Sequence, residues 1–597
     1  MAPSAACRGG CRPIALVAGA RLAGLAGASG TMPCPDCRHE VRVATSGARL
    51  TVPMRPEGGR REGGRVRRFV PVGWREVLDR LAAEARERQV RWVVLDTAVR
   101  ARFSRVLLDR VSAFLPQPIE IVRSPSPRRL LAEALAPEAR PADGPGRFER
   151  LRLLVLWGAE LGDTGGLGDR WPERARRDGA RRVFVGARGG PAAGEADRRI
   201  QPLPGTHAAI ALGAAHVARE VRGGRETGDP WPPARAAAVA GVSPDEIVWL
   251  GRSLADAAGE AMIVVGEEAA AGEAAGLLCR SLGELARTTG AVLAATLEGE
   301  PPGSGMPLPV GSAGAVARDA AWFAARLEER DAGSDVVVVS GPDPLTFWPG
   351  ASILARYLEK ARLVVRFALE IQGPTARRAD LLLPAPAFFE ASDAAAGAGI
   401  GPCPWGGQGA VPPPPEVRPP ERLWRGLGAR LGWPAEWFPE DLGPLLPPCA
   451  EGEAPPRGDA RVRSRECGGA VLGAEARVAP PARSTAFPLE FVPAPPAPER
   501  RLWIGMAPAD AEARGLSDGD LVVLRNDRGA VRGRLRVLPE QRTGVVTCPW
   551  SGSGGLAGPG PLFGADPDQP FPAFPQTEAV PGPGEGPWEG DLLFSTD

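Results

Sequence analysis

Four cysteines near the start of the chain have the spacing that most directly suggests chemistry. The chain has nine cysteines in 597 residues, and Cys7, Cys11, Cys34 and Cys37 fall within the first 37. The C-x3-C and C-x2-C pairs suit tetrahedral ligation of zinc by four thiolates. The surrounding segment is Gly-rich and irregular in pattern, with little apolar content to hold it folded. We therefore predict a metal that staples this segment together.

A second candidate is the Pro-Gly-Thr elbow formed by Pro204, Gly205 and Thr206. The elbow runs into an alanine-rich helix that carries His207 and His216, two of the three histidines in the chain. Three histidines and one tyrosine leave few groups for proton transfer near neutral pH. We interpret the two histidines as packed or capped structural residues and the elbow as a candidate border of a ligand site.

Five predicted strands end in Gly or Pro followed by small or polar residues. The five exits are Gly158-Ala159-Glu160, Gly186-Ala187-Arg188, Gly266-Glu267, Gly341-Pro342-Asp343-Pro344 and Gly373-Pro374-Thr375. In open α/β sheets, ligands lie at the carboxyl ends of the strands, where glycine lets backbone N–H groups approach phosphate. The series indicates a long nucleotide-like ligand across two sheets, whereas ordinary tight βα turns would give the same local pattern.

The elements that must position these exits alternate between buried apolar strands and helical stretches. "VRWVVLD" and "IEIV" flank one predicted helix, and "LLVLW" begins a second series of the same kind. Ser243 and Glu246 form a predicted capping box at the start of a later helix. After residue 500, alternating strands around an Asp-Arg-Gly turn predict a compact β-barrel. The alternation predicts an α/β protein with parallel sheets.

Composition sets further limits. A chain of 597 residues is too long for one core, so three or four domains are expected. With 72 Lys and Arg against 71 Asp and Glu, the charge is balanced and no nucleic-acid partner is expected. The apolar start "PIALVAGARLAGLAGASG" is interrupted by Arg21, and no apolar run reaches membrane-spanning length. We expect a cytoplasmic protein without a direct membrane span.

The order of motifs resembles the molybdopterin oxidoreductase superfamily. The motifs include "LLVLWGAELG", the Ala-Asp to Pro-Gly-Thr segment, "VVVVSGPDPLTFWPG", "TARRADLLLPAPAFFE" and the final barrel. The superfamily includes formate dehydrogenases, nitrate and polysulfide reductases, and the related large subunit of respiratory complex I. The resemblance extends from the first cysteines to about residue 550, and formate dehydrogenase is the type of relative that we expect this chain to be most like.

The resemblance implies a multidomain α/β architecture with two parallel-sheet domains, a small N-terminal metal domain and a C-terminal barrel. The first α/β domain is expected to be split, because the chain leaves it and returns. The predicted parts are the cysteine (iron–sulfur-like) domain at 1–65, the first α/β domain at 66–147 with 331–448, the second α/β, dinucleotide-binding domain at 148–330, a Pro/Gly-rich linker at 449–489, and a molybdopterin-dinucleotide-binding-like barrel at 490–597.

The resemblance also implies a bis-molybdopterin guanine dinucleotide cofactor along the strand exits. In relatives, the Pro-Gly-Thr elbow borders the guanine dinucleotide arm, although they usually have Asp where this chain has His207. The residues predicted to bind the cofactor are Gly158, Glu160, Arg188, Pro204, Gly205, Thr206, Gly341, Asp343, Thr375 and Asp380. We expect the elbow and the exits to line one continuous cleft.

Relatives also hold a [4Fe–4S] cluster through four N-terminal cysteines. Cys7 and Cys11 match the second and third ligands, Cys34 matches the fourth, and Ser4 stands where the first would be. Cys37 replaces a glycine of the family pattern, and Asp36 replaces a lysine. The site is therefore a rebuilt cluster with Cys37 as the fourth ligand, a zinc site, or a site without metal.

The molybdenum-ligand loop departs from the catalytic relatives. They supply Cys, selenocysteine, Ser or Asp, whereas "RSPSPRRLLAEAL" has no cysteine and offers Ser124 or Ser126, in what is also a simple turn sequence. After Glu390, the Gly-Thr to Asn stretch of relatives is lost.

Two functions follow. The first is an enzyme subunit that does two-electron chemistry on a small-molecule substrate and relays electrons through the N-terminal cluster to partner subunits. The second is a non-catalytic structural or electron-relay subunit of a respiratory or dehydrogenase complex.

Overall fold

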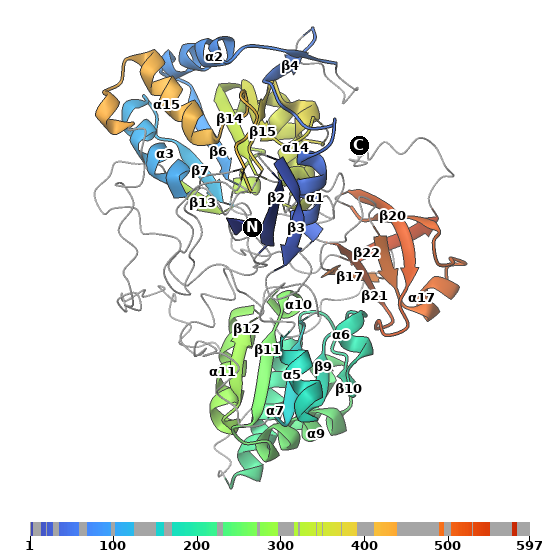
Figure 1. Cartoon of the computed structure of the whole chain (residues 1–597). Helices are drawn as coiled ribbons and strands as arrows, with labels where there is room; N and C mark the ends of the chain where they lie inside the picture. Colours follow the sequence, from blue (N-terminus) through green and yellow to red (C-terminus); the bar gives the residue numbers. More distant parts are fainter. Residues whose placement is uncertain are drawn as a thin grey trace.

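The structure is a computed structural model, and it describes most of the two α/β regions and the barrel (Figure 1). The described residues are 2–3, 13–18, 21–27, 35–58, 68–96, 102–123, 151–159, 170–223, 231–270, 275–295, 316–319, 323–341, 343–348, 350–371, 373–387, 389–390, 411–438, 489–494, 503–527, 529–549 and 576–581.

An eight-stranded sheet, called the larger sheet below, has the order β13-β7-β6-β14-β15-β16-β4-β5. Its strands are β4 (Met54–Pro56), β5 (Phe69–Pro71), β6 (Arg91–Asp96), β7 (Glu120–Arg123), β13 (Val316–Asp319), β14 (Asp335–Ser340), β15 (Leu363–Ala368) and β16 (Leu381–Pro384). The strands from β13 to β16 in that order are parallel, while β4 and β5 pair antiparallel at one edge. Both faces of the parallel strands are covered, which explains their continuous apolar runs.

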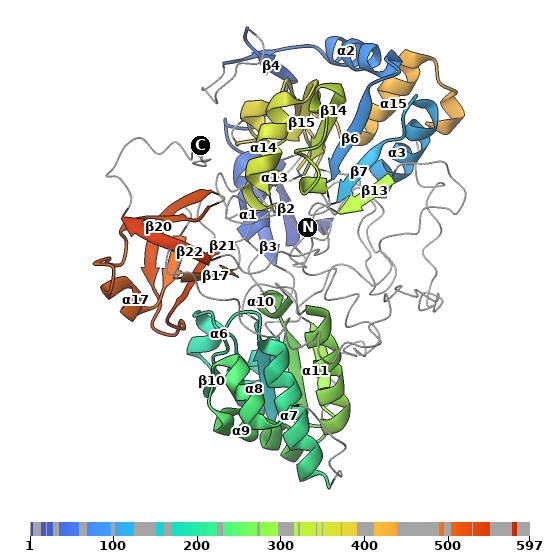
Figure 2. The same cartoon turned by 180° about the vertical axis from the view of Figure 1, so that it is seen from behind.

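Helices from distant parts of the chain cover the larger sheet. The helices α2 (Trp74–Arg86), α3 (Arg102–Phe114) and α15 (Pro420–Leu431) pack together on one face (Figures 1 and 2). The helix α14 (Ala351–Lys360) and the short α13 (Pro344–Phe347) lie on the other face. Each face therefore has its own apolar core.

The larger sheet combines strands that lie before and after the smaller sheet in sequence. Parallel pairing joins β6 to β14 along six residue pairs, from Asp335 opposite Arg91 to Ser340 opposite Asp96. The sheet also takes in β4 and β13, which fall in ranges that the sequence assigned to the neighbouring domains. These short strands have little sequence pattern of their own. Their pairing depends on the strands they join, β16 for β4 and β7 for β13.

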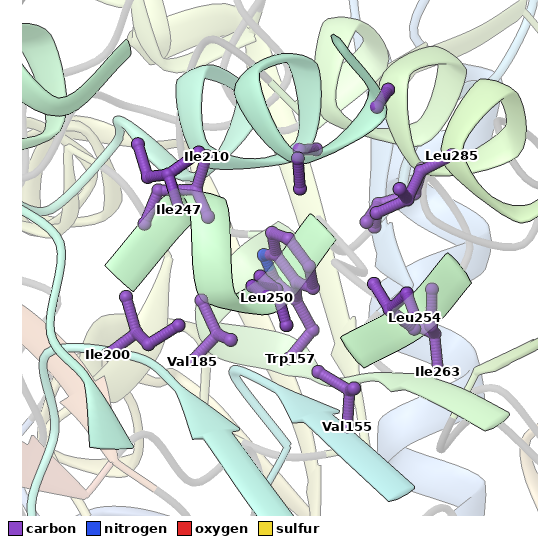
Figure 3. Packing of buried hydrophobic residues seen from close by; sticks show 14 of the residues in the cluster. Val155, Trp157, Val185, Ile200, Ile210, Ile247, Leu250, Leu254, Ile263 and Leu285 are labelled. Carbon is purple, nitrogen blue, oxygen red and sulfur yellow. The ribbon is translucent and has the colours of Figure 1, made fainter. Parts of the chain in front are cut away.

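The smaller sheet is parallel and five-stranded, with the order β10-β9-β8-β11-β12. Its strands are β8 (Leu153–Trp157), β9 (Arg181–Val185), β10 (Arg198–Ile200), β11 (Ala261–Val265) and β12 (Val292–Ala295). The helices α7 (His207–Val221), α8 (Pro233–Ala240), α9 (Pro244–Asp256) and α11 (Ala275–Thr289) pack with one core on one face. Figure 3 shows the aliphatic side chains of α7 and α9 pointing at those of the strands around Trp157.

The other face of the smaller sheet has a separate apolar core, which includes residues of α5 (Arg170–Asp178) and α6 (Pro191–Gly194). The predicted capping box is confirmed at the start of α9, where Ser243 Oγ accepts from Asp245 N–H at 3.2 Å and Glu246 accepts from Ser243 N–H at 2.9 Å.

The alanine-rich helix after the elbow is a core helix. A Cβ added at Gly251 of α9 would lie 2.7 Å from the carbonyl oxygen of Ala214 in α7, and one at Gly213 would lie 2.7 Å from Ala236 Cβ in α8. The helices approach this closely because small residues face each other. The composition of the segment is thus explained by packing.

The C-terminal strands form a closed barrel in the order β17-β21-β18-β20-β19-β22, as the alternating pattern predicted. They are β17 (Leu489–Ala494), β18 (Trp503–Met506), β19 (Leu521–Arg525), β20 (Ala530–Val537), β21 (Val545–Pro549) and β22 (Gln576–Pro581). The short helix α17 (Pro508–Glu512) follows β18. The barrel lies beside the two sheets, at the level between them (Figures 1 and 2).

The N-terminal segment is more regular than its Gly-rich sequence suggested. The strands β1 (Ala2–Pro3), β2 (Pro13–Ala18) and β3 (Arg21–Gly27) form an antiparallel sheet, followed by α1 (Pro35–Ala44). The prediction of an irregular segment is wrong for these residues, because two apolar stretches separated by two residues pair as strands. This sheet lies between the larger and the smaller sheets (Figures 1 and 2).

Among the described residues, no helix is both long and apolar enough to cross a membrane.

Candidate ligand-binding edges of the two sheets

The predicted exits of each sheet lie along one edge. In the smaller sheet, Trp157 at the end of β8 pairs with Val185 of β9 and Val265 of β11, so Gly158, Gly186 and Gly266 follow neighbouring strand ends. The short helix α10 (Glu267–Ala270) begins there, on the side that faces the larger sheet (Figures 1 and 2). We call the carboxyl ends of β8, β9 and β11 and the turns after them the smaller edge.

The corresponding edge of the larger sheet, called the larger edge, consists of the carboxyl ends of β14 and β15 with their exit turns. Asp343 caps α13 by accepting from Leu345 N–H at 3.1 Å through Oδ1. The Thr375 N–H donates to Asp343 Oδ2 at 3.0 Å, and the Thr375 hydroxyl donates to Oδ1. The structure thus brings together Asp343 and Thr375, which are predicted site residues 32 positions apart.

Close packing explains a glycine at the larger edge. Gly373 has φ +130°, and a Cβ there would lie 2.8 Å from Asp343 Oδ2. Gly341, directly after β14, also has a positive φ of +87°. Both exits therefore need glycine for backbone conformation, with or without a ligand.

Asp380 lies apart from the other predicted residues. Its Oδ2 accepts from Val364 N–H at 2.8 Å, near the amino end of β15, and it directly precedes β16. Because β15 and β16 are parallel, Asp380 belongs to the opposite edge of the larger sheet. There it ties two strands together.

Arg366 is a candidate that the sequence analysis missed. It lies in β15, whose other five residues are apolar, and only 6% of its surface is exposed. Within the described part of the chain, its Nη1 is buried and has no hydrogen-bond partner. Burial lowers the pKa of this guanidinium and the nearby Asp343 carboxylate opposes that effect. A single charged residue in the run "LVVRFA" was the available signal.

The smaller edge holds a buried group of three charged or polar side chains. Glu268 Oε1 accepts from Ala187 N–H at 2.6 Å. His207 Nε2 lies 3.6 Å from Glu268 Oε1, and Arg188 Nε lies 4.0 Å from Oε2. All three side chains are at most 3% exposed. We call Arg188, His207 and Glu268 the buried triad.

The surroundings of Glu268 favour the ionised form of its carboxyl group. Burial raises the pKa of its carboxyl group, but the contacts with His207 and Arg188 and the Ala187 N–H outweigh burial and hold the pKa below its ordinary value. His207 is therefore more than a packed histidine, because it faces a carboxylate. Neither of its ring nitrogens has a hydrogen-bond partner among the described residues.

The glycines of the smaller edge pack against the chain itself. A Cβ at Gly158 would lie 2.5 Å from Ala269 N, and one at Gly266 would lie 2.3 Å from Ala159 Cα. A Cβ at Gly186 would lie 2.8 Å from Glu268 Oε2. Contacts within the protein account for these three glycines, so they do not by themselves indicate phosphate.

The elbow is formed by local hydrogen bonds. Gly205 has φ +81°, and the Thr206 hydroxyl donates to Leu203 O at 2.6 Å. Thr206 is fully buried, and α7 begins at the next residue. On the same helix, His216 Nε2 lies 3.3 Å from Oε1 of Glu220, one helical turn later. This contact fits the structural role expected for His216.

The barrel contacts the smaller edge through the turn that follows β20. The Arg542 N–H donates to Ala187 O at 3.0 Å, and Gln201 Nε2 donates to Glu540 O at 2.7 Å. A Cβ at Gly189 would lie 2.9 Å from Gln541 N. This turn is thus fixed against the exit of β9, beside the buried triad.

Glu390, where the family pattern is lost, has a structural partner. Its carboxylate receives two hydrogen bonds from Arg49, at 2.7 Å from Nη1 and 2.5 Å from Nη2. It also accepts from Ala387 N–H at 2.9 Å. The pair fixes the segment after α1 against the end of the larger sheet.

Several predicted residues lie outside the described part of the chain. They are Cys7, Cys11, Cys34, Ser124, Ser126 and Glu160. Cys37 belongs to the first turn of α1. Within the described part, no group of three or more His, Cys, Asp or Glu side chains could hold a metal ion. The cysteine site, the serine ligands and one cleft joining both edges remain predictions.

Comparisons with known proteins agree with this architecture. A family model described as molybdopterin oxidoreductase matches residues 131–429, half of the chain, and one described as molydopterin dinucleotide binding domain matches residues 492–557. Among solved structures, the acetylene hydratase from Pelobacter acetylenicus is similar with a TM-score of 0.67 and 15% identity, covering 98% of this chain and 100% of that one. This likeness shows the fold. No curated protein matches the sequence.

Proposed function

Because the chain belongs to the molybdopterin oxidoreductase family, we propose that it is a molybdopterin-dependent oxidoreductase subunit that holds a molybdopterin guanine dinucleotide cofactor. The observation that carries the proposal is the contact between the barrel and the smaller edge. The barrel includes most of the range that matches the dinucleotide-binding model, and its turn at 540–542 is fixed against the exit of β9. The contact fixes the position of the barrel, the part of the chain that would contact such a cofactor.

The larger edge fits an anionic group, because Arg366 provides a buried guanidinium with a hydrogen-bonding nitrogen that no described residue uses. The smaller edge fits an anion less well, because Glu268 already takes the Ala187 N–H. When bound, such a cofactor supplies two-electron chemistry. The chain's own contribution is to bind and orient the cofactor, with Asp343 and Thr375 fixing the turns around Arg366.

Electrons would leave through the N-terminal site to a partner subunit. In this proposal Cys7, Cys11, Cys34 and Cys37 hold an iron–sulfur cluster, with zinc as the alternative. Iron with equimolar sulfide and broad visible absorption supports the cluster, whereas stoichiometric zinc without colour supports the alternative. Cys37→Ala should lose the metal and make the first 65 residues sensitive to protease, while Cys279→Ala, a buried cysteine of α11, serves as the control.

The cofactor proposal is tested by analysis of the purified chain. We expect molybdenum or tungsten together with a pterin that becomes fluorescent after oxidation. Protein that has neither pterin nor metal, when produced in a host that makes the cofactor, would contradict the proposal.

A second candidate function is a non-catalytic structural or electron-relay subunit of a larger complex. The observation that favours it is the buried carboxylate of Glu268, which fills part of the edge where a dinucleotide arm is expected. Iron in the N-terminal site without any pterin would support this function over the first.

A further inference from the structure

We propose that this chain binds one dinucleotide arm instead of two, with its phosphates at Arg366 on the larger edge, while Glu268 fills the smaller edge with the chain's own carboxylate. The inference rests on the proposed function, and it concerns how many arms the same two edges accept. Its basis is a difference in charge between the edges. At the larger edge, the buried guanidinium of Arg366 has a nitrogen, Nη1, without a hydrogen-bond partner among the described residues. At the smaller edge, the buried cation Arg188 and His207 already face the carboxylate of Glu268.

The position of Arg366 favours a ligand anion over a purely structural role. Side chains alternate between the faces of a strand, so Arg366 points to the same face as Val364, which packs with α14. Only 6% of Arg366 is exposed, and its buried Nη1 has no hydrogen-bond partner among the described residues. A buried charge without such bonds is costly to the fold.

Asp343 does not accept a hydrogen bond from Arg366 Nη1. Its two oxygens already accept from Leu345 N–H, Thr375 N–H and the Thr375 hydroxyl. The Asp343 carboxylate therefore stabilises the nearby positive charge electrostatically, but it does not form a pair of hydrogen bonds with the guanidinium. A planar guanidinium matches the oxygens of a phosphate in pairs, so a phosphate beside Arg366 would provide the missing partner.

The smaller edge has the opposite arrangement. Glu268 occupies the N–H of Ala187, the backbone donor that follows the β9 exit glycine. Its Oε2 also lies where a side chain on Gly186 would be, so the carboxylate fills space next to the strand end. Arg188 and His207 already face it at 4.0 and 3.6 Å.

A pyrophosphate could enter the smaller edge only by displacing Glu268. If the carboxylate stayed, two negative groups would lie close together in a region from which water is excluded, where repulsion is strong. If it left, Glu268 would need a new partner for a buried charge. The two edges therefore differ in their preference for anions, although both end parallel strands in glycine turns.

The test is the amount of GMP released by acid from the purified holoprotein, normalised to chain and to pterin. We expect one GMP per chain. Two GMP per chain would overturn this inference and leave the proposed function intact. Absence of both GMP and pterin would overturn the proposed function itself, and the inference with it.

A pair of variants tests which edge holds the arm. Arg366→Met should reduce retained GMP at least tenfold, whereas Arg362→Met, directly before the amino end of the same strand, should retain it. Arg362 pairs with Glu84 of α2, so it controls for the loss of an arginine near this strand. Thermal unfolding of both variants confirms that they fold. If folded Arg366→Met keeps its GMP, the assignment to the larger edge is wrong.

Discussion

Asp335 and Arg366 are buried charged residues in opposite halves of two neighbouring strands, and they differ in their hydrogen-bond partners. Asp335 begins β14, is fully buried, and accepts from Arg91 Nε at 2.7 Å, Arg330 Nε at 2.5 Å and the Tyr357 hydroxyl at 2.7 Å. Arg366 lies in the carboxyl half of β15, and its Nη1 has no hydrogen-bond partner in the part of the chain that the structure describes. The buried charge at the amino end of the sheet is thus matched, whereas no described residue forms a hydrogen bond with Arg366 Nη1.

The network around Asp335 joins four elements. Arg330 also donates to Glu120 of β7 at 2.6 Å, Arg91 belongs to β6, and Tyr357 belongs to α14. A buried charge with this many partners fixes the register of strands and helix. The comparison teaches that a matched buried charge supports the fold, while a guanidinium nitrogen that no described residue matches is where we propose that the ligand binds.

The largest effect is expected from Asp335→Ala, which removes the centre of the matched network. It leaves the Tyr357 hydroxyl and most of Arg330 buried without their carboxylate, so the free energy of unfolding should fall by about 3–5 kcal/mol. Denaturant or thermal unfolding measures it. Asp331→Ala, which removes an exposed cap nearby, is the control and should have a much smaller effect. Equal losses for the two variants would break the comparison.

Arg366→Met should change stability in the opposite direction. In cofactor-free protein, replacing an unmatched buried charge by an apolar side chain should raise the free energy of unfolding by about 1–3 kcal/mol. The same unfolding measurement applies, with Arg362→Met as the matched control. A loss of stability for Arg366→Met beyond that of Arg362→Met would mean that the chain itself satisfies this guanidinium.

Glu268→Gln tests a buried carboxylate of the smaller edge that already faces Arg188 and His207. Near neutral pH we expect a loss of about 1–2 kcal/mol, since the variant keeps an acceptor for Ala187 N–H but loses the charge that faces Arg188 and His207. The pKa of Glu268 is lowered, so its contribution to stability is present above the ordinary carboxyl value of 4.5 and disappears as pH falls through the folded value. The difference between wild type and variant should therefore shrink in acid, and a constant difference would contradict the assignment.

Ionisation of Tyr357 reports on the network around Asp335. Of the four tests, we expect this one to have the smallest effect on stability. Tyr357 is the only tyrosine, and burial together with the Asp335 charge raises its pKa well above 10.0, against the effect of Arg330. The raised pKa contributes stability that is present below the unfolded value and is lost as pH rises through the folded one. Alkaline titration followed by tyrosinate absorbance should show ionisation only as the chain unfolds. Ionisation near the ordinary pKa in folded protein would show that the network is open.

Much of the fold could be predicted from local pattern. The apolar runs of β6, β14 and β15, the capping box at Ser243 and the alternating barrel strands each depend on neighbours within a few residues. Edge strands were harder. The short β4 and β13 have no pattern that names a partner, so their place in the larger sheet was not expected.

The candidate site likewise has features that the sequence could predict and features that only the tertiary structure shows. The sequence by itself determined where each strand ends, and so placed Gly158, Arg188 and Asp343 at the carboxyl edges, because glycine and capping residues act on the backbone beside them. Only the tertiary structure decided that Asp343 meets Thr375 and that Glu268 faces His207. It also decided that Arg366 is buried, with its Nη1 left without a hydrogen-bond partner among the described residues. These relations join residues far apart in sequence. Burial and the distance between charges are properties of packing, which no single stretch of sequence contains.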